Sequence, residues 1–213
     1  MFLGDLQNLL TDVYALDMAY DIRDFLITDA SLAHALDGSG RRVDEKLLIA
    51  EDSGEAQVGL YLEERLVDRL NQNNPATRLD SANLEDFWTA FEGISHFTYY
   101  AWNATLEKSV TLLEMELQAE VDKFIATSLL LQQQGEAPPR GLHHWLFELP
   151  KLDCRLNDVE LERYRRANRY AGRYCRRIGP ALARGLDGDE LKRELRRFYR
   201  LSQPAKIEHI EAR

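Results

Sequence analysis

One histidine and several carboxylates in the middle of the sequence are of the residue types that bind metal ions. Glu92 and His96 are four residues apart, so a helix would place both on one face. The next apolar segment carries Glu114, Glu116 and Glu120. Four-helix bundles bind two metal ions with such residues, but they use a Glu-x-x-His motif in two helices. This sequence has Glu-x-x-x-His once, so we expect no metal and no cofactor. We interpret His96 as a buried, hydrogen-bonded residue and the glutamates of the next helix as exposed.

Aromatic residues surround this histidine. Seven of them fall within sixteen positions: Phe87, Trp88, Phe91, Phe97, Tyr99, Tyr100 and Trp102. A helix that is apolar on every side is a central, buried helix, and we favour this interpretation. The alternative is a pocket for an apolar ligand or a metal-dependent enzyme centred on His96. The candidate lining of that pocket is Trp88, Phe91, Glu92, His96 and Tyr100.

A segment in the last third of the chain is rich in arginine and has no acid among its arginines. At helical spacing, Arg166, Arg169, Arg173 and Arg176 form one continuous stripe. Arginine binds carboxylate and phosphate groups through paired N–H donors, so this segment is predicted to bind an anionic partner. The candidate contact residues are Arg163, Arg166, Arg169, Arg173, Arg176 and Arg177.

The partner that we favour for this segment is an acidic protein surface, on the same chain or on another molecule. Nucleic acid is the second alternative, because phosphates and stacked bases would suit the arginines and the interleaved tyrosines. The sequence pI of about 5.1 speaks against it, since nucleic-acid-binding domains are usually basic.

The common catalytic motifs are absent from the sequence. It contains no GxGxxG or GxxxxGK[ST] phosphate loop, no G-x-S-x-G elbow, no HExxH and no CxxC. We therefore expect a non-enzymatic interaction or regulatory protein of a cytosolic complex. The alternatives are the nucleic-acid-associated protein that uses residues 163–177 and the ligand-binding or metal-dependent protein centred on His96.

Hydrophobic periodicity predicts the elements that position these residues. Helical spacing is found over residues 5–22, 29–36, 63–71, 81–102, 106–131, 161–178 and 191–199. Two β-type runs, 46–51 and 56–62, flank a turn at residues 52–55 and predict a hairpin, which must pack on helices or pair with residues 24–28. The segment 106–131 reads as a long amphipathic helix, and Gly179-Pro180 is expected to break the arginine helix. The predicted fold is mainly α, with a bundle-like core and a small N-terminal antiparallel hairpin.

Charge divides the chain at a loop rich in glycine, proline and glutamine near residue 137. Residues 1–137 hold 25 acids and 9 bases, whereas residues 138–213 hold 11 acids and 18 bases. We expect an acidic portion, 1–137, and a basic helical portion, 138–213, packed on it, as two domains or as one. The two cysteines, Cys154 and Cys175, suggest no disulfide framework, and neither a signal peptide nor a membrane span is apparent, so a cytoplasmic location is expected.

Overall fold

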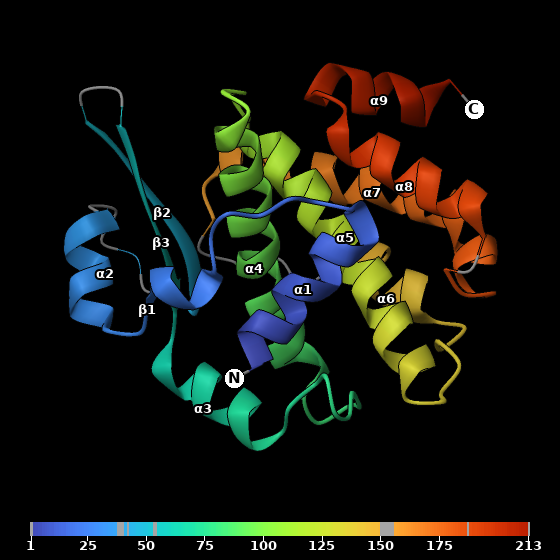
Figure 1. The fold of residues 1–213 in the computed structure, drawn as a ribbon, viewed down its shortest axis with the longest axis horizontal. Coiled ribbons are helices and arrows are strands. Elements are labelled where there is room, and N and C mark those ends of the chain that lie inside the picture. Colours follow the sequence, from blue (N-terminus) through green and yellow to red (C-terminus); the bar gives the residue numbers. More distant parts are fainter. Residues whose placement is uncertain are drawn as a thin grey trace.

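The computed structural model describes residues 2–37, 41, 43–52, 55–149, 156–186 and 188–212. Figure 1 shows a helical molecule with a small sheet at one side. The helices are α1 (Phe2–Tyr14), the 3-10 helix η1 (Ile22–Phe25), α2 (Ala30–Asp37), α3 (Glu64–Gln72), α4 (Leu84–Thr105), α5 (Leu112–Gln133), α6 (Leu142–Phe147), α7 (Asp158–Leu182), α8 (Asp189–Arg200) and α9 (Gln203–Glu211). The strands are β1 (Leu26–Ile27), β2 (Glu45–Asp52) and β3 (Glu55–Leu62). The mainly α fold with a minor β element is as predicted.

The sheet contains the predicted hairpin and one additional short strand. β2 pairs antiparallel with β3, and β1 pairs parallel with β3 on its other side, which makes the sheet mixed rather than purely antiparallel. Residues 53 and 54 of the predicted turn lie outside the described residues, as do 38–40 of the predicted turn after α2. The sheet lies between α2 and α4 (Figure 1), so the hairpin gains the helical support that it needs in water.

The centre of the molecule is an antiparallel pair, α4 and α5. The direction follows from contacts that run in opposite order along the two helices, from Trp88 with Thr127 to Tyr99 with Glu114. The prediction for α5 was wrong in two respects. The helix begins at Leu112, where the side chain of Thr111 caps it, and it is buried on almost every side rather than amphipathic.

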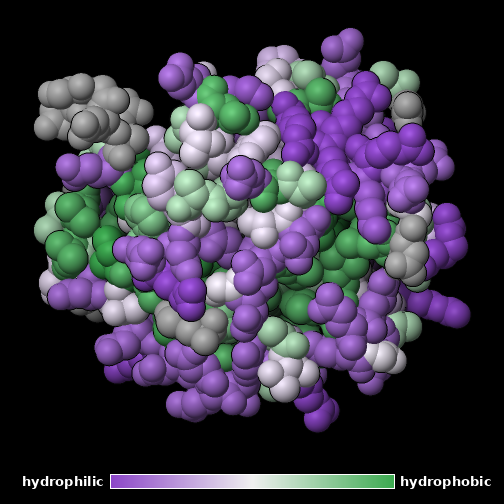
Figure 2. Space-filling model, viewed as in Figure 1, coloured by the Kyte–Doolittle hydropathy of each residue, from purple (hydrophilic) through white to green (hydrophobic). Residues whose placement is uncertain are grey.

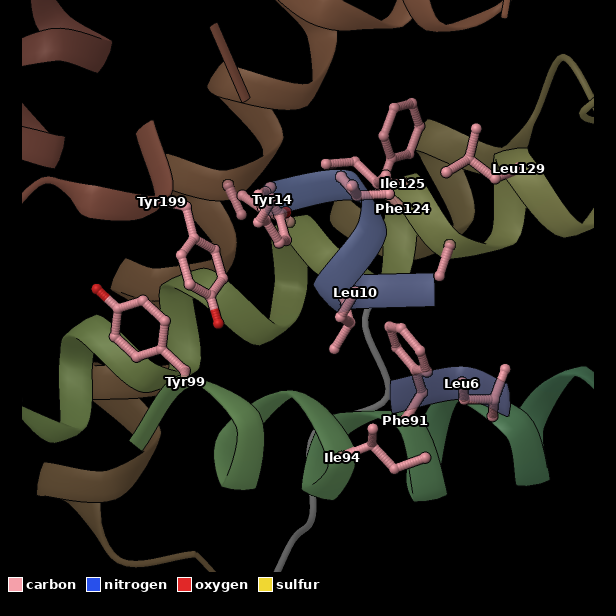
Figure 3. Packing of buried hydrophobic residues seen from close by; sticks show 14 of the residues in the cluster. Leu6, Leu10, Tyr14, Phe91, Ile94, Tyr99, Phe124, Ile125, Leu129 and Tyr199 are labelled. Carbon is pink, nitrogen blue, oxygen red and sulfur yellow. The ribbon is translucent and has the colours of Figure 1, made fainter. Parts of the chain in front are cut away.

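One hydrophobic core joins the acidic and basic portions of the chain. Figure 3 shows residues of α1, α4, α5 and α8 within it. The rings of Tyr14 and Tyr199 stack at a centroid distance of 4.0 Å, and the edge of Tyr99 meets Tyr199 at 4.9 Å. Aromatic packing therefore ties residues from the two portions to the same centre.

The arginine helix α7 lies along α5 and runs through Pro180. Proline was expected to break this helix. It is tolerated because α7 ends at Leu182, so the missing N–H and the ring affect only the last turn. At the other end, Asn157 and Glu160 form a capping box.

Helix α8 packs against α1, and two of its arginines bind carbonyl oxygens at the C-terminal end of α1. Arg200 donates to the carbonyl oxygens of Tyr14 and Ala15, both at 3.0 Å, and Arg196 donates to that of Val13. These carbonyls have no partner within α1, so the arginines satisfy the negative end of the helix dipole.

Within the described residues, no helix is both long and apolar enough to cross a membrane.

Candidate metal centre

Seven titratable side chains from four elements meet where α4, α5, α7 and the start of β2 come together. We call them the charged cluster: Glu45 of β2, Glu92 and His96 of α4, Glu116, Glu120 and Lys123 of α5, and Arg163 of α7. Their side chains are between 8 and 21 % exposed. Charged groups are rarely this buried unless they are paired or bind a ligand.

Three members of the charged cluster have the arrangement of metal ligands. Glu45, Glu92 and His96 each offer one ligand atom, and the three atoms lie within 4.8 Å of one another. Glu92 and His96 share a face of α4 through their four-residue spacing, as the sequence predicted. Glu45 comes from the sheet, and it fits between them because residue 93 is glycine: a Cβ there would lie 2.7 Å from Glu45 Oε1.

His96 is surrounded by carboxylates without a hydrogen bond at its buried Nε2 atom. Nε2 lies 3.4 Å from Glu116 Oε2, and Nδ1 lies 3.7 Å from Glu45 Oε1. Among the described residues, neither Nε2 of His96 nor Oε1 of Glu45 has a hydrogen-bond partner. Buried polar atoms almost always have one, so these two atoms are exceptions that need an explanation.

The two permanent cations of the charged cluster differ in how they are bound. Lys123 Nζ lies 3.0 Å from Glu92 Oε2 and 2.5 Å from Glu120 Oε1, so it forms ion pairs with two carboxylates. Arg163 Nε is 3.7 Å from the nearest carboxylate oxygen, that of Glu116, and makes no hydrogen bond to a described residue. Four carboxylates face two permanent cations and one histidine, so the cluster has an excess of negative charge.

Burial and neighbouring charges both shift the pKa values of the charged cluster. Burial raises the pKa of Glu45 and that of Glu120. Burial acts to lower the pKa of His96, but the carboxylates of Glu116 and Glu45 outweigh it and hold that pKa well above its ordinary value. Burial also acts to raise the pKa of Glu92, and the charges of Lys123 and His96 overcome it, so this pKa is lowered. The raised pKa of His96 thus reflects the carboxylates around it, whereas the raised pKa values of Glu45 and Glu120 mainly reflect burial.

A second buried polar group lies next to the charged cluster on the same two helices, where Ser95 and Asp122 directly precede His96 and Lys123. We call it the Asp122 network: Tyr14, Ser95, Gln118, Asp122 and Lys206. Asp122 accepts hydrogen bonds from Tyr14, from Ser95 at 2.6 Å and from Gln118 at 2.7 Å. Lys206 of α9 donates to the Oε1 atom of Gln118. All five residues are at most 1 % exposed.

Lys206 is enclosed by aromatic rings. Its Nζ lies 4.6 to 5.7 Å from the ring centroids of Tyr99, Phe198 and Tyr199. Burial lowers the pKa of Lys206 to about 7, against the opposing charges of Glu114 and Asp122. Burial raises the pKa of Asp122 to about 6, although its three hydrogen-bond donors act to lower it.

The structure distributes the candidate pocket residues among different environments. Glu92 and His96 belong to the charged cluster, whereas Phe91 is fully buried in the hydrophobic core. Trp88 is half-buried and donates from Nε1 to the hydroxyl of Thr127 at 3.0 Å. Tyr100 packs at the edge of the core. Aromatic residues of α4 thus form core rather than one side of a pocket.

The candidate arginines also lie in different environments. Arg163 points into the charged cluster, and Arg177 is half-buried between Glu194 and the carbonyl oxygen of His209. Arg176 is exposed and lies 3.2 Å from Glu148. The remaining three are Arg166, which is half-buried, and Arg169 and Arg173, which are exposed; none of them forms an ion pair with a described residue.

Neighbouring helices add to this basic surface. Arg193 and Arg197 of α8 are exposed as well. Figure 2 shows strongly hydrophilic side chains gathered in the upper right of the view, where Figure 1 places α8. Cys175 is a free, buried thiol, and Cys154 lies outside the described residues.

Sequence reasoning missed Glu45 and misjudged the α5 carboxylates. Glu116 was interpreted as an exposed residue of an amphipathic helix, but it is 7 % exposed and faces His96. Glu45 has no local signal, because its place depends on the packing of β2 against α4. The one available hint is Gly93, since glycine in the middle of a helix is unfavourable unless another group approaches closely.

Comparison of the chain with protein-family models, with curated proteins and with solved structures finds no match.

Proposed function

We propose that this protein binds a divalent transition-metal ion through Glu45, Glu92 and His96. The observation that carries the proposal is the convergence of these three ligand atoms within 4.8 Å, together with the buried Oε1 atom of Glu45, which has no hydrogen bond to a described residue. Nitrogen and carboxylate ligands lie ~2.0–2.2 Å from such an ion, so the three side chains would rotate toward one another to bind it.

The donor set favours Mn²⁺, Fe²⁺ or Zn²⁺. Imidazole suits transition metals, whereas Ca²⁺ and Mg²⁺ take oxygen ligands almost exclusively. Two carboxylates beside one histidine are also harder donors than the thiolates that select Cu⁺.

Charge balance supports the same proposal. Glu116 and Glu120 lie beside the three ligands, and only Lys123 and Arg163 compensate the four carboxylates permanently. Uncompensated charge is costly away from water. A divalent cation would supply the missing positive charge and a partner for His96.

Metal titration of the purified, metal-stripped protein tests this proposal. We expect isothermal titration calorimetry to give one site for Mn²⁺ or Zn²⁺, with an affinity that Glu45→Gln, Glu92→Gln and His96→Ala each reduce by at least about 100-fold. Glu120→Gln is the matched control, because it neutralises a buried carboxylate of the same cluster that is not one of the three ligands. Absence of saturable binding, or an equal loss in Glu120→Gln, would overturn the proposal.

A second candidate function is binding of an acidic protein by the exposed arginines of α7. Its specific observation is that Arg169 and Arg173 protrude without an ion pair to any described residue, on a protein whose net charge is −9. An Arg169→Gln, Arg173→Gln double variant should lose retention on immobilised polyglutamate at about 150 mM salt, whereas Arg65→Gln, an exposed arginine elsewhere, should keep it. Retention of the wild type on duplex DNA instead, lost in the double variant, would favour the nucleic-acid alternative.

A further inference from the structure

Arg163 is the less tightly paired of the two permanent cations in the charged cluster. Its guanidinium enters the charged cluster from α7, and its Nε atom is buried without a hydrogen bond to a described residue. Lys123 provides the contrast, since two carboxylates lie within hydrogen-bonding distance of its Nζ. A counter-ion for Glu116 would close the 3.7 Å separation to a hydrogen bond of about 2.7–2.9 Å, the usual charge-assisted distance.

The geometry points to a small oxyanion, a carboxylate or phosphate group, as the ligand that this centre takes together with its metal. Three protein ligands leave at least one coordination position of a transition-metal ion for a further group, which is the usual arrangement in catalytic centres. Arginine is the side chain best suited to hold an oxyanion there, because its planar N–H donors match two oxygens. Glu116 lies between His96 and Arg163, so the metal ligands and the arginine flank one region. This inference rests on the proposed metal centre.

Glu92 and Arg163 are the most exposed side chains of the charged cluster. Glu92 is 21 % exposed and Arg163 is 20 % exposed, whereas His96 and Glu116 are 8 % exposed. The half-buried ring of Tyr164 lies beside Arg163, with the guanidinium 5.7 Å from the ring centroid. An oxyanion would lie between the positive metal and the guanidinium, and the attraction of these two cations would offset its repulsion from the cluster carboxylates.

Calorimetric titration of Mn²⁺-loaded protein with inorganic phosphate, and separately with acetate, tests this inference. We expect wild-type protein to bind one of the two anions and to bind Mn²⁺ about tenfold more tightly in its presence, as coupled ligands commonly do. The arm that gives heat identifies phosphate or carboxylate as the preferred group. Arg163→Gln should keep the Mn²⁺ site and lose the anion. Arg163→Lys should retain part of the anion affinity, and Arg165→Gln, an exposed arginine two residues away, should behave as wild type.

The outcomes separate the inference from the metal proposal. If no metal binds, the proposed function fails. If Mn²⁺ binds to both wild type and Arg163→Gln but neither anion binds to the loaded wild type, the inference alone is overturned. Anion binding that is equal in Arg163→Gln, or equal in metal-free protein, also overturns it. If Arg163→Gln does not fold, as judged by thermal melting, the comparison of Arg163→Lys with wild type still decides, because a structural role would leave anion affinity unchanged.

Discussion

The charged cluster and the Asp122 network are neighbours on the same two helices, yet their buried polar atoms differ in whether they form hydrogen bonds. Ser95 precedes His96 on α4, and Asp122 precedes Lys123 on α5, so each helix contributes adjacent residues to both. In the Asp122 network, one carboxylate receives three hydrogen bonds. In the charged cluster, the buried Nε2 of His96 and Oε1 of Glu45 have no hydrogen bond to a described residue. A satisfied network stabilises the fold, whereas buried polar atoms without hydrogen bonds are costly unless a ligand pairs with them.

The largest expected effect on stability is in the Asp122 network. Asp122→Asn replaces an acceptor of three hydrogen bonds by a group that also donates, and it removes a negative charge near Lys206. We expect a loss of about 3 kcal/mol in the free energy of unfolding, because the donors are left buried and unsatisfied. Urea denaturation at pH 7 measures it, and a loss below about 1 kcal/mol would show that the network is not structural.

Lys206 should give the fold a pH dependence above neutrality. Its pKa in the folded protein, about 7, is below the 10.5 of the unfolded chain, so between these values the unfolded state binds more protons. Stability should therefore rise with pH by about 2 kcal/mol between pH 7 and 9. Lys206→Met fits the aromatic enclosure without a charge and should lack this rise in urea denaturation. Parallel pH profiles for the two proteins would contradict the prediction.

Gly93→Ala should disturb the charged cluster although residue 93 is not one of its members. The added Cβ would lie 2.7 Å from side-chain atoms of Glu45 and Leu60, so these two side chains must move away from α4. We expect about 1–2 kcal/mol of destabilisation and a weaker metal affinity because Glu45 is displaced. Gly4→Ala is the control: its nearest contact would be an ordinary 3.5 Å to Arg23, and its stability should be unchanged or slightly higher.

The smallest expected effect on stability is that of removing a carboxylate charge from the charged cluster, in contrast to Asp122→Asn. Glu45→Gln should change the stability of metal-free protein by less than about 1 kcal/mol, and in the stabilising direction, since it removes excess negative charge from a buried cluster. The same urea experiment that detects a large loss in Asp122→Asn should find little in Glu45→Gln. A loss as large as that of Asp122→Asn would make the two regions equivalent and would remove the contrast.

Local patterns in the sequence predicted the hairpin and the aromatic helix α4. Both depend on signals within about twenty residues: period-two alternation in β3, and aromatic residues around the whole circumference of α4. The spacing of Glu92 and His96 was equally local. These features could be derived because the backbone period alone decides which side chains share a face.

The rest of the site could not be derived in this way, because it is tertiary. The polar residues of α5 made it appear amphipathic, but Glu116 and Gln118 face partners on α4, α7 and α9 rather than water. Glu45 reaches α4 only through the packing of the hairpin. Arg163 is one of seven arginines within fifteen residues, and no spacing distinguishes it from those that face solvent.

The arginine contacts between α8 and α1 have a consequence for how the chain acquires its structure. Arg196 and Arg200 complete the end of a helix that was made about 185 residues earlier. During synthesis, α1 leaves the ribosome long before the groups that satisfy its last carbonyls exist. Such distant contacts slow folding, because the loop between them must close before they give any stability. Helix α1 can therefore pack against α4 and α5 as soon as these are made, but its C-terminal carbonyls are satisfied only once Arg200 has been synthesised.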